Sequence, residues 1–161
     1  MEFPKRKLQR LKDYDYSKSG AYYITICTER RLPLFGKIAN GAVLLNCAGK
    51  MIEEKLLNIN CGAVSVVKYC IMPDHVHMIL LISENGTTQG SFPTTIPQIV
   101  QRFKTATTKQ YIDGVKAGKY LPFDKKIWQK SFYDHIIRNE QGFNEICRYI
   151  DENPMNWDFH F

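Results

Sequence analysis

Two histidines stand one residue apart in the apolar run from Met72 to Ile82, which reads MPDHVHMILLI. Side chains two positions apart in a β-strand project from the same face, so His75 and His77 would point one way and Val76 the other. Neutral imidazole is the commonest metal ligand in proteins. The pair is therefore a candidate for two ligands of one metal ion. Taken alone, the motif is more typical of a wetted or hydrogen-bonded sheet face, because ligation needs further donors.

A second pair of functional side chains lies near the end of the chain. Tyr149 and Asn153 are four residues apart and share one face of a helical segment. That face lies about a quarter turn from an apolar stripe. If the stripe packs on a sheet, we expect Tyr149 and Asn153 at the edge of the contact, neither buried nor fully solvated. Tyrosine can act as a nucleophile, although packing is its commoner role, and Tyr133 is a comparable candidate.

Other familiar catalytic patterns are absent from the sequence. It contains no H-E-x-x-H, no G-x-S-x-G and no glycine-rich phosphate loop. A cysteine nucleophile has no identifiable base partner. The histidine pair and the late helix therefore carry the candidate chemistry.

The elements that must position these residues follow from local patterns. Residues 21–30, 41–46, 63–72 and 75–83 are rich in β-branched and apolar residues and predict strands, and a short strand is expected within 127–139. Helical periodicity predicts helices over 48–59, from 96 to about 113, and over 139–154. In the last helix, Asn139 is a plausible N-cap, Phe143, Ile146, Cys147 and Ile150 form the stripe, and Pro154 should end it at Asn153. This order favours an α+β, ferredoxin-like fold, with a mainly antiparallel sheet covered by helices.

The composition is that of one globular domain spanning residues 1–161, with 44% hydrophobic residues. No apolar run approaches the roughly 20 residues of a membrane span, and the N-terminus lacks the apolar core of a signal peptide, so we expect a cytoplasmic protein without a membrane partner. The net charge of +6 is a modest hint of a polyanionic partner. Part of that charge lies in a basic N-terminal arm, residues 1–20, although such runs are as often solvated tails.

Longer stretches resemble the single-tyrosine HUH transposases, specifically the REP-associated, IS200-like group. HUH denotes His–hydrophobic–His, supplied here by His75, Val76 and His77. The resemblance covers nearly the whole chain, in the order DYSKSGAYYITICTERRLPLFG, YCIMPDHVHMILLI, IVQRFKTATTKQY and WQKSFYDHIIRNEQGFNEICRYIDENP. The context of the histidines and the ending RYIDENP are its most specific parts.

The resemblance implies a single-strand DNA endonuclease and strand transferase. By this analogy Tyr149 is the catalytic nucleophile, forming a 5′-phosphotyrosine intermediate. His75, His77 and Asn153 would hold a divalent ion, Mg²⁺ or Mn²⁺, although this donor set would also accept Zn²⁺. Relatives exist as dimers and as monomers, so a homodimer and a monomer are both open. No additional C-terminal DNA-binding segment is expected after the tyrosine helix.

The implied partner is single-stranded or hairpin DNA, bound through backbone charge and aromatic stacking. The candidate DNA-binding residues are Arg10 in the N-terminal arm, Arg102, Lys104 and Lys109 in the helix that follows a flexible loop, and Tyr133, His135 and Arg138 around the last strand. Two alternatives stay open. One is a non-catalytic nucleic-acid-binding module on a ferredoxin-like sheet, and the other is a metal-dependent hydrolase that uses an activated water.

Overall fold

A four-stranded antiparallel sheet forms the centre of the computed structural model, which describes residues 20–60, 62–83 and 95–157. The strands are β1 (Gly20–Cys27), β4 (Val64–Met72), β5 (His75–Ile82) and β6 (Tyr133–Ile137), in the spatial order β4-β5-β1-β6. Each neighbouring pair is antiparallel. Arg10 and nearly all of the expected basic arm lie outside the described residues.

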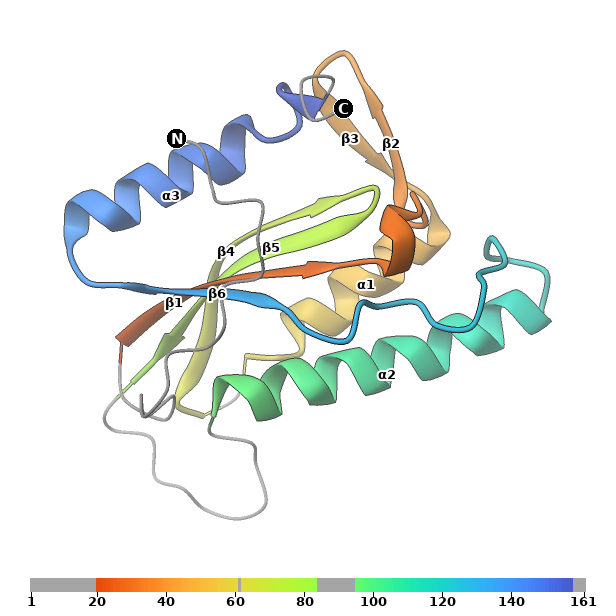
Figure 1. The fold of residues 1–161 in the computed structure, drawn as a ribbon, viewed down its shortest axis with the longest axis horizontal. Coiled ribbons are helices and arrows are strands. Elements are labelled where there is room, and N and C mark those ends of the chain that lie inside the picture. Colours follow the sequence, from red (N-terminus) through yellow and green to blue (C-terminus); the bar gives the residue numbers. More distant parts are fainter. Residues whose placement is uncertain (1–19, 61, 84–94, 158–161) are drawn as a thin grey trace.

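One face of this sheet packs on two helices, α1 (Cys47–Leu57) and α2 (Ile96–Lys116), as Figure 1 shows. Alternate residues of the two central strands point into this main core, among them Ile24, Ile26, Val76 and Met78. Each such aliphatic side chain contributes about 1.5–3 kcal/mol when removed from water. The period-two alternation therefore commits the intervening residues, including His75 and His77, to the other face.

The helix α3 (Glu140–Glu152) lies along that second face (Figure 1). A smaller core joins it to the sheet and consists of Tyr23, Ile79, Ile146 and Ile150, with Phe143 and Cys147 packed partly buried against it. The predicted stripe is thus the face that docks. The arrangement of helices around a mainly antiparallel sheet confirms the expected fold class.

Local signals set the helix boundaries. The Asn139 side chain accepts a hydrogen bond from the Gly142 backbone N–H at 2.7 Å, which makes Asn139 the N-cap of α3 as expected. Asn153 keeps helical dihedral angles (φ −57°, ψ −44°) although it precedes Pro154, so the expectation that proline would exclude this geometry was wrong. The regular helix nevertheless ends at Glu152, one residue before Asn153. The helix α2 continues to Lys116, beyond the expected end near Asp113.

A separate two-stranded hairpin, β2 (Gly36–Ala39) and β3 (Ala42–Leu45), follows a short 3₁₀ turn, η1 (Glu29–Arg31). Only its second strand was expected. The turn residues Asn40 and Gly41 both have positive φ, 53° and 73°, the conformation for which Asn-Gly is the strongest short hairpin signal. Among the described residues, no helix is both long and apolar enough to cross a membrane.

Candidate active site

The two imidazoles of β5 face one another beneath α3. His75 and His77 are both buried, and their Nε2 atoms lie 2.8 Å apart. Their rings meet edge to face, with centroids 4.4 Å apart. The side chains thus converge at their tips, as the period-two pattern predicted.

The Nδ1 atom of each imidazole, which lies away from the facing Nε2 atoms, contacts a different set of polar groups. Asp74 Oδ1 lies 2.6 Å from Nδ1 of His75, so the ring N–H donates to the carboxylate. The hydroxyls of Tyr23 and Thr25 lie 2.8 and 2.9 Å from Nδ1 of His77. Metal-binding histidines commonly use their second nitrogen in this way, which fixes the ring and aims the other nitrogen at the ion.

These bonds have a consequence for the space between the rings. If both Nδ1 atoms carry their protons, two Nε2 lone pairs face each other at 2.8 Å. That arrangement is repulsive unless a proton or a cation lies between them. Burial lowers the pKa of His75 below its ordinary value, which disfavours an additional proton on this ring near neutral pH. A cation between the rings would relieve this repulsion. In the other tautomer of His77, its Nε2–H donates to Nε2 of His75 and its Nδ1 accepts from a hydroxyl.

The helix α3 supplies the next two groups. The ring of Tyr149 lies edge-on to His77, with centroids 5.7 Å apart and planes at 71°. Asn153 lies one turn further on, where its side chain is close enough to lower the pKa of Tyr149 and to raise that of His75. The predicted i, i+4 pair therefore meets the histidine pair at one site.

Asn153 differs from expectation in its burial. The edge position predicted from the helical arithmetic holds for Tyr149, which is half-buried, whereas Asn153 is only 2% exposed. Its Oδ1 has no hydrogen-bond partner among the described residues. A buried acceptor without a partner costs about 1–3 kcal/mol, so such an atom points to a ligand.

The donor set fits a divalent ion. Two imidazole nitrogens and one buried amide oxygen converge here, and Mg²⁺, Mn²⁺ and Zn²⁺ are all chemically compatible with such a set. In the described part of the chain, no three His, Cys, Asp or Glu side chains gather as a metal site. The third protein donor would therefore be the amide of Asn153.

The Tyr149 phenol keeps its proton at neutral pH unless neighbouring groups help to remove it. Burial raises the pKa of its phenol, and this effect outweighs the opposing effects of the Asn153 side chain and the positive charge of Arg31. A nucleophilic phenol must lose its proton during attack, so nearby positive charge would assist that step.

Several neighbours of the site were not expected from the sequence. Besides Asp74, Tyr23 and Thr25, these are Arg31, whose Nε donates to Asp74 Oδ2 at 2.9 Å, and Trp157, whose ring stacks on His75 with centroids 6.5 Å apart. The Pro-Asp turn before His75 was visible in the sequence. The roles of Tyr23, Thr25 and Arg31 depend on strand pairing, since Thr25 lies opposite His77 and Cys27 opposite His75.

Arg31 also lies in an unusual backbone conformation. Both Arg30 and Arg31 have φ of 56°, in the left-handed region. This conformation costs a non-glycine residue about 1–2 kcal/mol. Such outliers persist where surrounding contacts impose them and cluster at functional sites.

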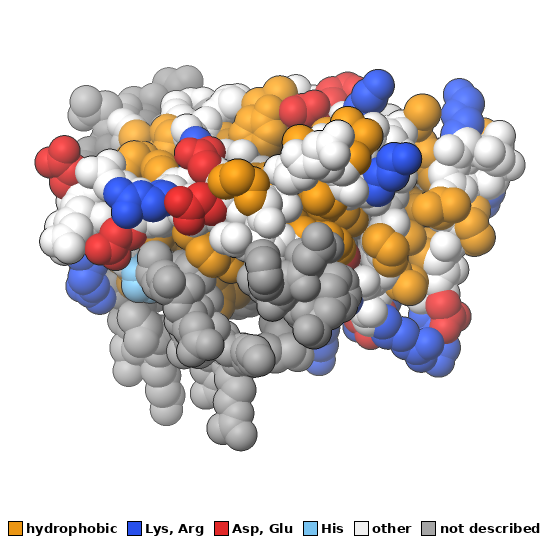
Figure 2. Space-filling model, turned by 90° about the horizontal axis from the view of Figure 1, so that it is seen from above, with side chains coloured by type: hydrophobic (Ala, Val, Ile, Leu, Met, Phe, Trp, Pro, Cys, Tyr) orange, Lys and Arg blue, Asp and Glu red, His pale blue; other side chains and the backbone are white. Residues whose placement is uncertain are grey.

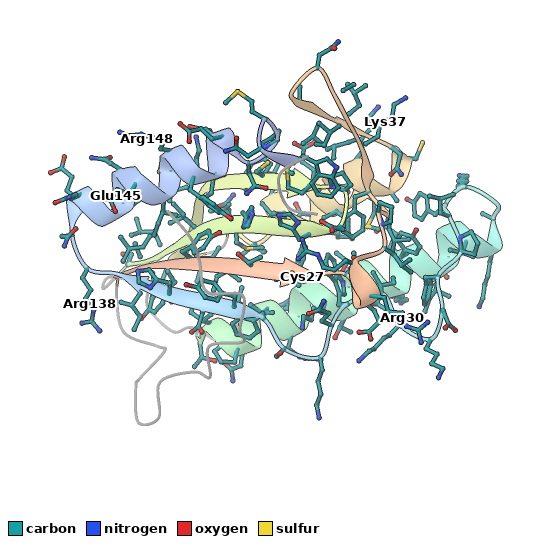
Figure 3. The ribbon with its side chains drawn as sticks, turned by 45° about the horizontal axis from the view of Figure 1, so that its top comes forward. Cys27, Arg30, Lys37, Arg138, Glu145 and Arg148 are labelled. Carbon is teal, nitrogen blue, oxygen red and sulfur yellow. The ribbon has the colours of Figure 1, made fainter. Side chains whose placement is uncertain are left out.

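The candidate residues around β6 separate into two groups. Tyr133 is half-buried and packs edge-on against Tyr23, with centroids 5.9 Å apart, which places it next to the site. His135 is exposed and pairs with Tyr23 across the sheet. Arg138 lies at the far end of the sheet from Cys27, as Figure 3 shows. The register agrees, since Ile137 pairs with Ala21.

The candidates on α2 lie on the other side of the sheet from the histidines (Figure 1). Arg102 and Lys109 are exposed there. The Lys104 ammonium donates to the carbonyls of Gln129, Lys130 and Ser131 at 2.8, 3.4 and 3.4 Å. Lys104 thus ties α2 to the segment before β6, and the DNA-binding roles of all three residues stay predictions.

Surface charge does not mark a binding face among the described residues on the α3 side of the molecule. On the face seen from the α3 side, basic and acidic side chains are interspersed with hydrophobic ones, and the described residues form no continuous basic patch there (Figure 2). Arg148 points outward from α3, away from the sheet (Figure 3). One positive charge that acts on the candidate site is that of Arg31, which lowers the pKa of Tyr149.

Comparisons with known proteins relate the chain to a family. The family model for IS200-like transposases matches residues 17–153. An uncharacterised protein of Haemophilus influenzae is 34% identical, over 95% of this chain and 90% of its own length. A second protein of that organism, provisionally named as a REP-associated tyrosine transposase, is 24% identical over 88% of this chain and 73% of its own.

Two solved structures share the fold. A REP-associated tyrosine transposase bound to a REP hairpin superposes with a TM-score of 0.57 at 22% identity, covering 93% of this chain and 74% of that one. A transposase-like protein from Deinococcus radiodurans R1 gives a TM-score of 0.52 at 20% identity, covering 89% and 96%. The match over residues 17–153 decides the relationship: the chain belongs to the IS200-like transposase family.

Proposed function

We propose that this protein cuts and rejoins single-stranded, hairpin-forming DNA through a covalent bond between Tyr149 and a 5′-phosphate. The observation that carries the proposal is the position of the Tyr149 phenol, edge-on to His77 and close enough to the buried Asn153 for that side chain to lower its pKa. A nucleophile, two imidazole nitrogens and an unsatisfied amide oxygen meet at one place. The hairpin substrate is suggested by the REP hairpin bound to the similar solved transposase.

The chain's residues would divide the reaction between them. The Tyr149 oxygen attacks the phosphorus, and its bond to phosphorus forms as the bond to the 3′-oxygen breaks. The phenolic proton leaves to solvent, and the departing 3′-oxygen takes up a proton from solvent. The products are a 5′-phosphotyrosine and a free 3′-hydroxyl. His75, His77 and Asn153 would hold Mg²⁺ or Mn²⁺, which supplies Lewis-acid stabilisation of charge on the phosphate.

Rejoining needs no separate energy source. The phosphotyrosine keeps a phosphodiester bond in place of the one that was cut, so the 3′-hydroxyl of another DNA end can attack it and release Tyr149. Tyr149 itself is only half-buried. Cleavage and strand transfer are then the same reaction in opposite directions.

The test uses a pool of single-stranded oligonucleotides, each with a variable hairpin and flanks, incubated with the full chain and Mg²⁺ or Mn²⁺. We expect a protein–DNA adduct on denaturing gels that retains a label at the 3′ end of the DNA. A label at the 5′ end should instead appear on a shorter, protein-free fragment. An adduct that retains only the 5′ label would contradict the proposed polarity.

The alternatives give different results in the same assay. A non-catalytic binding module would bind the pool and leave every strand intact. A metal-dependent hydrolase would shorten the DNA without forming an adduct, and its turnover would survive Tyr149→Phe. Size-exclusion chromatography of the same sample would distinguish a homodimer from a monomer.

A further inference from the structure

Arg31 is held at the rim of the site by three hydrogen bonds, of which the longest joins its Nη2 to Asp74 Oδ1 at 3.4 Å. Its Nε donates to Asp74 Oδ2 at 2.9 Å, and its Nη1 donates to Cys27 Sγ at 2.8 Å. Asp74 in turn accepts from His75 Nδ1 at 2.6 Å. A short contact of 3.3 Å between Arg31 Nη2 and the same Nδ1 cannot be a hydrogen bond in this tautomer, because both atoms are donors. Asp74 is therefore the anchor shared by Arg31 and His75.

The two members of this ion pair differ sharply in exposure. The side chain of Asp74 is 6% exposed, whereas that of Arg31 is 47% exposed. A guanidinium has five N–H donors in a planar fork, and Asp74 and Cys27 engage only part of it. The carboxylate is thus buried, while nearly half of the Arg31 side chain is exposed and three of its five N–H groups are engaged. An arginine held in this way keeps two N–H donors with which it can bind a planar or tetrahedral oxyanion.

The charge of Arg31 reaches the candidate nucleophile. It is among the groups that lower the pKa of the Tyr149 phenol, against the larger raising effect of burial. His75 is hydrogen-bonded to the same carboxylate, that of Asp74. A phosphate placed between Tyr149 and the histidine pair would therefore be attracted by the positive charge of this guanidinium.

We propose that Arg31 is a phosphate-binding residue of this site, held by Asp74 so that its guanidinium donates to a non-bridging oxygen of the DNA phosphate that Tyr149 attacks. The proposal deepens the proposed function and rests on it. Arg31 would stabilise charge on that oxygen while the bond to Tyr149 forms and the bond to the 3′-oxygen breaks. The left-handed backbone conformation of Arg31 would then help to direct its guanidinium toward the site.

Arg30 provides a matched control. It belongs to the same turn and has the same φ of 56°. Its guanidinium pairs with Asp124 at 3.5 Å and points away from the end of β1 where Cys27 lies (Figure 3). Arg30→Ala therefore removes the same charge from a residue with the same backbone φ as Arg31→Ala, without removing a group from the site.

The experiment compares Arg31→Ala, Arg31→Lys, Arg30→Ala and Asp74→Asn in the full chain. The first measurement is the single-turnover rate of adduct formation with an oligonucleotide from the hairpin pool. We expect Arg31→Ala to be slower by about 100-fold or more, as when one preorganised donor to a transition state is removed. Arg31→Lys should be intermediate, since lysine keeps the charge and loses the fork. Arg30→Ala should stay within about threefold of the natural protein, the scatter expected of a surface change.

The second measurement is the affinity for Mn²⁺ alone, from electron paramagnetic resonance without DNA. Arg31→Ala should keep it within about threefold, because Asp74 still accepts from His75. Asp74→Asn should lose about 10- to 100-fold, as is typical when an outer-shell partner of a ligand is changed. If Arg31→Ala lost Mn²⁺ affinity in step with its rate, Arg31 would act only through His75 and the proposal would be overturned. Adduct formation at the natural rate in Arg31→Ala would also overturn it.

A third measurement separates failure of this proposal from failure of the proposed function. Binding of a mixed-sequence 20-nucleotide single strand is followed against salt concentration. One lost phosphate contact reduces the slope of log K against log salt by about 0.7. We expect that reduction in Arg31→Ala and not in Arg30→Ala. If no adduct ever forms but the slope falls in this way, the cleavage function fails and the phosphate contact stands. An unchanged slope in Arg31→Ala would overturn the contact itself.

Discussion

The phenol ring of Tyr149 lies edge-on against the imidazole of His77, with ring centroids 5.7 Å apart and planes at 71°. One residue comes from the helix that covers the sheet and the other from a central strand. Because Asn153 follows one turn later on the same helix, the docking of α3 brings the candidate nucleophile and the third candidate metal donor to the histidines in one step. The account therefore predicts that metal binding and helix docking depend on one another.

Asn153→Leu tests the amide oxygen as a metal donor. In the natural protein, Mg²⁺ or Mn²⁺ at about 100 times its Kd should stabilise the fold by about 2.7 kcal/mol, seen as a rise in Tm. Asn153→Leu should abolish this rise while changing metal-free stability by less than about 1–2 kcal/mol, because leucine fills a similar volume and removes an unsatisfied buried oxygen. The exposed Asn156 on the next turn supplies the control, Asn156→Leu. A full metal-induced rise in Asn153→Leu would exclude the amide as a ligand.

Tyr23 and Thr25 are predicted to support His77 redundantly. Both hydroxyls lie within 2.9 Å of its Nδ1, yet a single ring N–H needs one acceptor. Tyr23→Phe should therefore cost about 1 kcal/mol of stability and leave Mn²⁺ affinity within about threefold. The double change Tyr23→Phe with Thr25→Val should lower Mn²⁺ affinity about 10- to 100-fold. If Tyr23→Phe alone lost the full affinity, Thr25 would not be an effective partner.

Local sequence patterns predicted the parts of this site that depend on one element at a time. Period-two alternation placed His75 and His77 on one face, and helical spacing placed Tyr149 and Asn153 together. The N-cap at Asn139 and the docking stripe through Ile146 and Ile150 were also predicted correctly. Each follows from the geometry of a single strand or helix and needs no knowledge of its neighbours.

The remaining features depend on how elements meet. Thr25 reaches His77 only because β1 pairs with β5 in one particular register. The burial of Asn153 depends on the depth at which α3 docks, which helical arithmetic does not give. The backbone conformation of Arg31 and its contact with Asp74 likewise arise from a turn packed against another turn. The hairpin strand β2 was different, since its Asn40-Gly41 signal was present in the sequence and was overlooked.

Lys104 is predicted to stabilise the fold. Its ammonium donates to three carbonyls of the segment before β6, of which only that of Gln129 lies at a short distance, 2.8 Å. One well-formed charged hydrogen bond contributes about 1.5–3 kcal/mol. Lys104→Met should lower the free energy of unfolding in urea by about 1–3 kcal/mol. Lys109→Met, an exposed position on the same helix, should change it by less than about 0.5 kcal/mol. Equal stability of the two variants would return Lys104 to the group of possible DNA contacts.

The central claim is that Tyr149, and not the neighbouring Tyr133, forms the bond to DNA. The most direct measurement is mass spectrometry of the adduct after nuclease trimming and trypsin digestion, because cleavage at Arg138 separates the two tyrosines into different peptides. The account predicts a nucleotide phosphate on the peptide that contains Tyr149, and no adduct from Tyr149→Phe. A modified peptide from residues 131–138, which contains Tyr133, would contradict it.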